Sequence, residues 1–337
     1  MSGSESIIDN LVIAPVALAP AVITSDSSAF NLSVSLQTSG ERKLTLTSPF
    51  FVRGEIRNQA SAAWETLCSI LRRHGIPLFA QAVELNGVPV GNLPARIAVR
   101  SIGQPIIKAE LMTADALELS NCDAAGDHWG WPYEIEGSRD LKNFVQVFRD
   151  ATRCDVPIGM SLPLGATASD MRACVESSVD FLTLKHSFQC LAHGQTASMA
   201  AVCVLNARKQ CVQLGRPNLP LLLDTPLVDL EHIIKLLAMG ATAVNVGKLI
   251  SNAMPSVNPM QSESKLAESL LGGLVPATKS VRELPQVERT LGELVTRLKA
   301  TLQFAGVIEM NQFDTGCLRS LSNSVSEMTG IALLGNR

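Results

Sequence analysis

The chain has few aromatic residues, no block of basic residues and no closely spaced pair of cysteines. Aromatic residues make up only 4% of its 337 residues, so its core must consist mainly of aliphatic side chains. The formal net charge is −3 and no basic cluster occurs, which argues against a nucleic-acid partner. The eight cysteines form no Cys-X-X-Cys pair, which argues against structural zinc and against thioredoxin-like redox chemistry.

The sequence offers one candidate for a targeting or membrane segment, and we expect that it is neither. The apolar stretch from Leu11 to Ile23 is too short to span a bilayer and is interrupted by Pro15 and Pro20. The first basic residue is Arg42, so the positive region of a signal peptide is absent. Scattered cysteines fit a reducing compartment. We therefore expect a cytoplasmic protein, outside the membrane, whose N-terminal arm packs on its own core or on a neighbouring subunit of a homo-oligomer.

Eight short apolar runs that end in polar or small residues predict eight β-strands. In the second half of the chain these runs alternate with amphipathic helix patterns, which is typical of a parallel α/β sheet. We predict a (β/α)8 TIM-type barrel, with a three-layer open sheet as the alternative. The predicted strands begin at Leu44, Pro77, Ala95, Asp115, Val156, Val179, Leu219 and Ala243.

The barrel is predicted to occupy residues 44–255, after an extended N-terminal arm over residues 1–43. Residues 256–337 are predicted to form a loop and C-terminal helices that pack on the barrel. The first strand is expected to run from Leu44 to Val52, and the last helix between Thr315 and Met328. The strand from Val179 to Leu184 should be almost fully buried, because barrel strands are covered on both faces.

Polar residues at the carboxyl ends of the predicted strands are the candidate catalytic residues, because active sites of barrels lie there. Lys185 ends the sixth strand and is followed by His186. A lysine at this position can act as a Schiff-base nucleophile or bind an anion, or it can simply extend to solvent. Asp224 ends the seventh strand, where it can orient Lys185, bind a substrate amine or hydroxyl, or serve as a turn residue before Pro226. Arg53 follows the first strand and can bind an anion.

A second group of polar residues lies in the aromatic loop after the fourth strand. Asp123, Asp127 and His128 have no spacing typical of a metal site, so we predict a polar loop and no metal. Trp129 and Trp131 of the same loop can cover a ligand or anchor the loop.

Several strand motifs resemble the flavin-binding barrel of the glutamate synthase family, most clearly over residues 140–250. Val179-Asp-Phe-Leu-Thr-Leu184 is similar to the family's "ADFITID" strand. Leu237-Ala-Met-Gly-Ala-Thr-Ala-Val-Asn245 is similar to its "LGADAVN" stretch. Arg139-Asp-Leu-Lys-Asn143 followed by Cys154-Asp-Val-Pro-Ile-Gly159 is similar to the family's helix leading into a "PVGVK" strand. The resemblance implies an FMN-binding barrel oxidoreductase.

The functional motifs of that family are altered in this chain. Its flavin-contacting lysine falls on Met160, and its phosphate-binding "SGG" turn falls on Asp224-Thr225-Pro226. An aspartate repels phosphate, and Pro226 has no N–H to donate. Gly247 and Lys248 match the family's final "GR" turn and, with Arg53, are the predicted cofactor-binding residues. Cysteines that match the family's iron–sulfur ligands are absent, so no cluster is predicted.

Three functions follow as hypotheses from these observations. The first is a glutamate synthase-like FMN-barrel oxidoreductase homologue with an altered and weakly flavin-binding, or flavin-free, active site. The second is a non-catalytic barrel that serves as a subunit or binding protein. The third is a lyase or aldolase that uses Lys185 as its nucleophile.

Overall fold

The computed structural model describes ten segments of the chain, and every structural statement below refers to them. They are residues 6–16, 30–36, 44–53, 61–80, 93–101, 113–120, 135–153, 156–186, 196–254 and 284–335.

Eight parallel strands close into a barrel in their order along the chain, with the last strand paired to the first. The prediction of a (β/α)8 barrel is confirmed, and the open sheet is excluded. The strands are β4 (Phe50–Arg53), β5 (Leu78–Ala80), β6 (Arg96–Ser101), β7 (Ala116–Ser120), β8 (Ile158–Pro163), β9 (Phe181–Lys185), β10 (Leu221–Asp224) and β11 (Ala243–Asn245).

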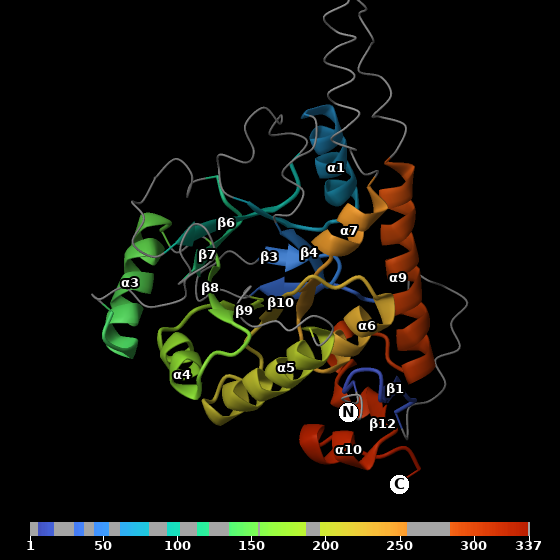
Figure 1. Ribbon diagram of the computed structural model, residues 1–337. Helices are drawn as coiled ribbons and strands as arrows, with labels where there is room; N and C mark the ends of the chain where they lie inside the picture. The colour runs from blue at the N-terminus through green and yellow to red at the C-terminus, as the bar shows by residue number, and fades with distance from the viewer. Residues whose placement is uncertain are drawn as a thin grey trace, which may run out of the picture.

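Helices pack around this barrel, and from β7 onward they alternate with its strands (Figure 1). Their apolar faces pack on the outer face of the strands in one large core, which leaves the polar faces to solvent. The helices between the strands and after the last one are α1 (Ser61–Arg73), α3 (Ser138–Ala151), α4 (Ala168–Glu176), α5 (Thr196–Gln213), α6 (Leu230–Ala238) and α7 (Gly247–Ala253).

The strand β9 shows the burial expected of a barrel strand. Every residue from Val179 to Leu184 is at most 4% exposed, which confirms the sequence prediction. Inward and outward side chains alternate along the strand, so its two faces contribute to two different cores. Leu182 belongs to the core beneath the helices, whereas Phe181 belongs to a smaller core inside the barrel.

The predicted first strand, Leu44 to Val52, is wrong as a single element. Leu44–Leu46 forms β3, which pairs antiparallel with β2 (Val34–Leu36), and the barrel strand β4 begins only at Phe50. Pro49, at the start of the barrel strand, breaks the run, because proline has no N–H to donate to a neighbouring strand. Leu36 and Leu46 of this hairpin join the core inside the barrel and close the amino ends of its strands.

The N-terminal arm packs on the C-terminal part of the chain. Its strand β1 (Leu11–Ile13) pairs antiparallel with β12 (Leu318–Ser320), and Leu11 is fully buried. Asp9 contacts His232 of α6 at 2.8 Å between Oδ1 and Nε2. Hydrogen bonds from Ser6 and His232 lower the pKa of Asp9. Over residues 6–16 the expected packing arm is therefore present; residues 17–23 lie outside the described segments.

The C-terminal extension contains one long helix and several short elements. The helix α9 (Pro285–Ala305) buries the predicted leucine stripe and lies beside α7 (Figure 1). The single last helix predicted between Thr315 and Met328 is wrong. A 3-10 turn (Thr315–Cys317), β12 and α10 (Asn323–Thr329) replace it, because pairing with the N-terminal arm holds residues 318–320 extended. No helix of the described segments has both the length and the apolar character that a membrane span requires.

Candidate functional site

The inside of the barrel has an apolar layer below and a polar layer above. Six strands carry a small or apolar inward residue followed, two positions later, by a polar inward residue at the carboxyl end. Since side chains alternate along a strand, both residues of each pair face the barrel interior. The pairs are Phe51 and Arg53, Ala116 and Glu118, Gly159 and Ser161, Phe181 and Thr183, Leu222 and Asp224, and Ala243 and Asn245.

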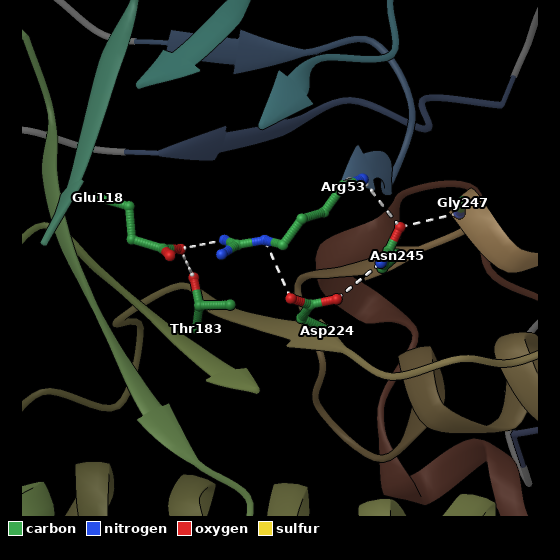
Figure 2. A network of polar contacts seen from close by, with 6 residues as sticks. All are labelled: Arg53, Glu118, Thr183, Asp224, Asn245 and Gly247. Carbon is green, nitrogen blue, oxygen red and sulfur yellow. Dashed lines mark hydrogen bonds and ion pairs between the residues drawn. The ribbon is translucent and has the colours of Figure 1, made fainter. Parts of the chain in front are cut away.

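Arg53 crosses the polar layer and joins two carboxylates on opposite sides of the barrel (Figure 2). Its Nη2 lies 2.6 Å from Glu118 Oε2 on β7, and its Nε lies 3.0 Å from Asp224 Oδ2 on β10. The guanidinium also stacks over the ring of Phe79 at 4.3 Å, a favourable cation–π geometry. Thr183 donates to the same Glu118 oxygen at 2.5 Å. Arg53 therefore holds together the strands that carry Glu118 and Asp224 in the polar layer, at the end of the barrel that we call its mouth.

The network continues from Asp224 to the start of α7 (Figure 2). The Asn245 amide donates to Asp224 Oδ1 at 2.7 Å, and its Oδ1 accepts from the Gly247 and Arg53 backbone amides. A Cβ on Gly247 would lie 2.9 Å from the Arg53 carbonyl oxygen, so a side chain does not fit there. The small size of Gly247 therefore serves the close packing of α7 against β4.

Two buried oxygen atoms of the polar layer have no hydrogen-bond partner in the described residues. They are Glu118 Oε1 and Ser161 Oγ, and both side chains are fully buried. A buried acceptor without a donor costs free energy, and most buried polar atoms in proteins are paired. These two atoms mark the part of the layer where a bound group can form hydrogen bonds.

All six residues predicted for the site lie at the carboxyl ends of the barrel strands or directly after them. Arg53, Asp224 and the amide of Gly247 belong to the network. Lys185, His186 and Lys248 are half-buried at the same edge. Lys185 is paired in register with Asp224, and the His186 amide donates to the Asp224 carbonyl oxygen at 2.9 Å. Their roles as catalytic or cofactor-binding residues stay predictions.

The expectation that Met160 lies at the site is wrong. Met160 is fully buried and its sulfur lies 3.3 Å from Cys174 Sγ of α4, so the side chain faces the outer core. The adjacent Gly159 and Ser161 face inward instead. A Cβ on Gly159 would lie 2.1 Å from the Phe181 ring, which fills the space inside the barrel.

Sequence reasoning missed Glu118, Ser161, Thr183 and Asn245. Each lies inside a predicted strand, where a polar residue attracts no notice among apolar neighbours. Their common signal is position, because each follows an inward small or apolar residue by two places near the end of its strand. These residues can be recognised by their position only when the inward face of each strand is known.

Other chemistry receives no support from the described residues. No cluster of three His, Cys, Asp or Glu side chains able to hold a metal ion occurs among them. Burial raises the pKa of the Cys68 thiol to about 11 and also raises that of Cys211, which disfavours nucleophilic thiolates. The aromatic-loop residues Asp123, Asp127 and His128, with Trp129 and Trp131, lie outside the described segments.

Solved structures with the same fold include (S)-mandelate dehydrogenase, flavocytochrome b2 and mandelate oxidase. A monotopic membrane protein, (S)-mandelate dehydrogenase, has a TM-score of 0.59 at 12% identity, covering 93% of this chain and 89% of that one. Flavocytochrome b2 with sulfite bound has a TM-score of 0.60 at 12% identity, covering 98% and 80%. A mandelate oxidase mutant with an FMN adduct has a TM-score of 0.57 at 13% identity, covering 93% and 88%.

These likenesses support the flavin-barrel fold that the sequence motifs predicted. At such low identity they show the fold and leave the activity open. No protein-family model and no curated protein sequence matches the chain.

The residues present do not fit the phosphate of a flavin. A phosphate needs several N–H donors and little negative charge nearby. At the β10 and β11 ends the Gly247 amide already donates to Asn245, Pro226 has no N–H, and Asp224 is a carboxylate. The guanidinium of Arg53 is shared between Asp224 and Glu118. The sequence argument against tight phosphate binding therefore gains a geometric basis.

Proposed function

We propose that the protein is an FMN-barrel oxidoreductase homologue, glutamate synthase-like in its strand motifs, with an altered active site. Its mouth holds FMN weakly at best and binds a small polar ligand at the carboxyl ends of the strands. The observation that carries the proposal is the Arg53 ion network across the mouth of a barrel whose solved neighbours are flavin-linked enzymes.

The charges of the network explain why a small ligand that donates hydrogen bonds is favoured over FMN. A flavin gains negative charge on reduction, so it is stabilised where cationic groups face it. Here the Arg53 guanidinium is already engaged by Glu118 and Asp224, which leaves carboxylate oxygens in the layer below the mouth. An electron-rich ring and a phosphate are both disfavoured at this surface, whereas a group that donates hydrogen bonds is favoured.

The visible spectrum of the purified full-length chain and its titration with FMN test the proposal. We expect no stoichiometric absorbance near about 450 nm from bound flavin, and a dissociation constant in the micromolar range or weaker by fluorescence quenching. Asp224→Asn removes a negative charge from the turn and should bind FMN more tightly than the parent. A nanomolar dissociation constant for the unaltered chain would sink the proposal.

A further inference from the structure

Ser161 and Glu118 offer two unpartnered oxygen atoms from neighbouring strands. Thr183 on β9 donates to Glu118 on β7, and β8 with Ser161 lies between these two strands. The side chains of all three residues are fully buried and face the barrel interior. Glu118 Oε2 receives both Arg53 and Thr183, while Glu118 Oε1 and Ser161 Oγ have no partner in the described residues.

The chemistry of these atoms selects a hydrogen-bond donor. An ionised carboxylate oxygen can only accept, and a serine hydroxyl can accept as well as donate. Glu118 Oε1 therefore requires a donor from the ligand, and a group with two or more donors can satisfy both atoms at once. A primary ammonium group carries three donors in a compact volume, which suits a narrow barrel interior.

Charge favours a cation over a neutral donor or an anion. Glu118 and Asp224 share the single guanidinium of Arg53, so Glu118 is only partly compensated. Lys185 lies nearer the rim, where it is half-buried and in register with Asp224 on the neighbouring strand. A hydrogen bond to an ionised group is also stronger than one between neutral groups.

We propose that the barrel mouth binds the primary ammonium group of a small ligand between Glu118 Oε1 and Ser161 Oγ. This inference rests on the proposed function, in which the mouth holds a small polar ligand, and it names the chemical class of that ligand. It also predicts discrimination against carboxylates, since an anion would approach a partly compensated Glu118.

Calorimetric titration of the full chain with three probes of three carbon atoms each tests the charge preference. The probes are n-propylammonium chloride, n-propanol and sodium propionate, at matched ionic strength. We expect saturable binding of propylammonium in the millimolar range, as is usual for a ligand with so few atoms, and no saturable binding of the other two. Absence of saturable propylammonium binding, or propionate binding at least as tightly, overturns the proposal.

Variants locate the binding within the barrel. Ser161→Ala removes one acceptor and should weaken propylammonium binding about fivefold, the worth of one hydrogen bond. Glu118→Gln removes the charge at nearly constant size and should abolish binding. Ser177→Ala is the matched control, because Ser177 is also buried but donates to the Cys174 carbonyl oxygen at the end of α4. Its affinity for propylammonium should equal that of the parent.

The thermal midpoint of each variant shows whether it is folded. If Glu118→Gln does not fold, the comparison of Ser161→Ala with Ser177→Ala decides the question alone. Equal affinities in those two variants would place the ammonium elsewhere and overturn the proposal. Failure of the amine titration leaves the FMN result untouched, so the two proposals can fall separately.

Discussion

The inward side chains of the barrel differ between its two ends. We call the apolar layer near the amino ends of the strands the floor, and the polar layer near their carboxyl ends the mouth. At the floor, Phe51 and Phe181 pack with the hairpin leucines Leu36 and Leu46 in a core that is closed to solvent. Two residues further along the strands, the inward side chains are Arg53, Glu118, Thr183, Asp224 and Asn245.

The difference separates residues kept for stability from residues kept for another reason. Burying apolar area stabilises the fold by about 25 cal/mol for each Å² removed from water. Burying an ion network gains little, because desolvation offsets the attraction, and apolar replacements of equal volume are often as stable. Burying the polar residues of the mouth therefore stabilises the fold less than burying the apolar residues of the floor. We infer that these polar residues are kept at the mouth because they bind a ligand.

The largest expected effect comes from the floor. Phe181→Ala removes a fully buried ring from the closed interior and should lower the free energy of unfolding by about 4 kcal/mol. Chemical denaturation measures this change. Phe144→Ala on the partly buried face of α3 is the control and should cost clearly less. Equal losses for the two variants would contradict a tightly packed floor.

A double variant tests whether the Phe181 ring occupies the space next to Gly159 at the floor. Gly159→Ala alone should destabilise the chain, because its Cβ would lie 2.1 Å from the Phe181 ring. In the Phe181→Ala background the same substitution should cost almost nothing. A similar cost for Gly159→Ala in both backgrounds would show that the ring does not fill this space.

The next prediction concerns the contribution of the Arg53 ion pairs at the mouth to the stability of the fold. Arg53→Met leaves Glu118 and Asp224 buried without their cation and should cost about 3 kcal/mol of stability. Adding Glu118→Gln and Asp224→Asn removes the unpaired charges, so the triple variant should regain most of the loss. Urea denaturation of the three proteins measures it. A triple variant no more stable than Arg53→Met would mean that the fold itself requires the ion network.

The fold could be predicted because its signals are local and repeated. Apolar runs with polar ends predicted all eight strand regions. The hairpin of β2 and β3 was missed, because the run from Leu44 to Val52 is β-prone on both sides of Pro49. Which side of Pro49 forms the barrel strand depends on contacts that only the tertiary structure reveals.

The site could be predicted only where polar residues end a strand. Asp224 and Arg53 satisfied that rule and belong to the network. Glu118 and Asn245 did not stand out, because their importance depends on side chains from distant strands that meet inside the barrel. The error at Met160 is different in kind. Matching Pro157-Ile-Gly159 to the letters "PVG" puts the lysine of "PVGVK" on Ser161, and a slip of one residue moves a position to the other face of the strand.

The smallest expected change in stability is also the one that best separates structure from binding. Thr183→Val keeps the shape of the side chain but removes the hydroxyl that donates to Glu118 Oε2, so unfolding free energy should fall by about 1 kcal/mol. Glu118 is then held by Arg53 alone, so the position of its second carboxylate oxygen is less fixed. Affinity for propylammonium should consequently fall although the protein remains folded at room temperature. Thr183→Ser retains the donor and should keep the affinity. If Thr183→Val lowers stability but not affinity, the hydroxyl serves the fold alone, and this part of the mouth behaves like the floor.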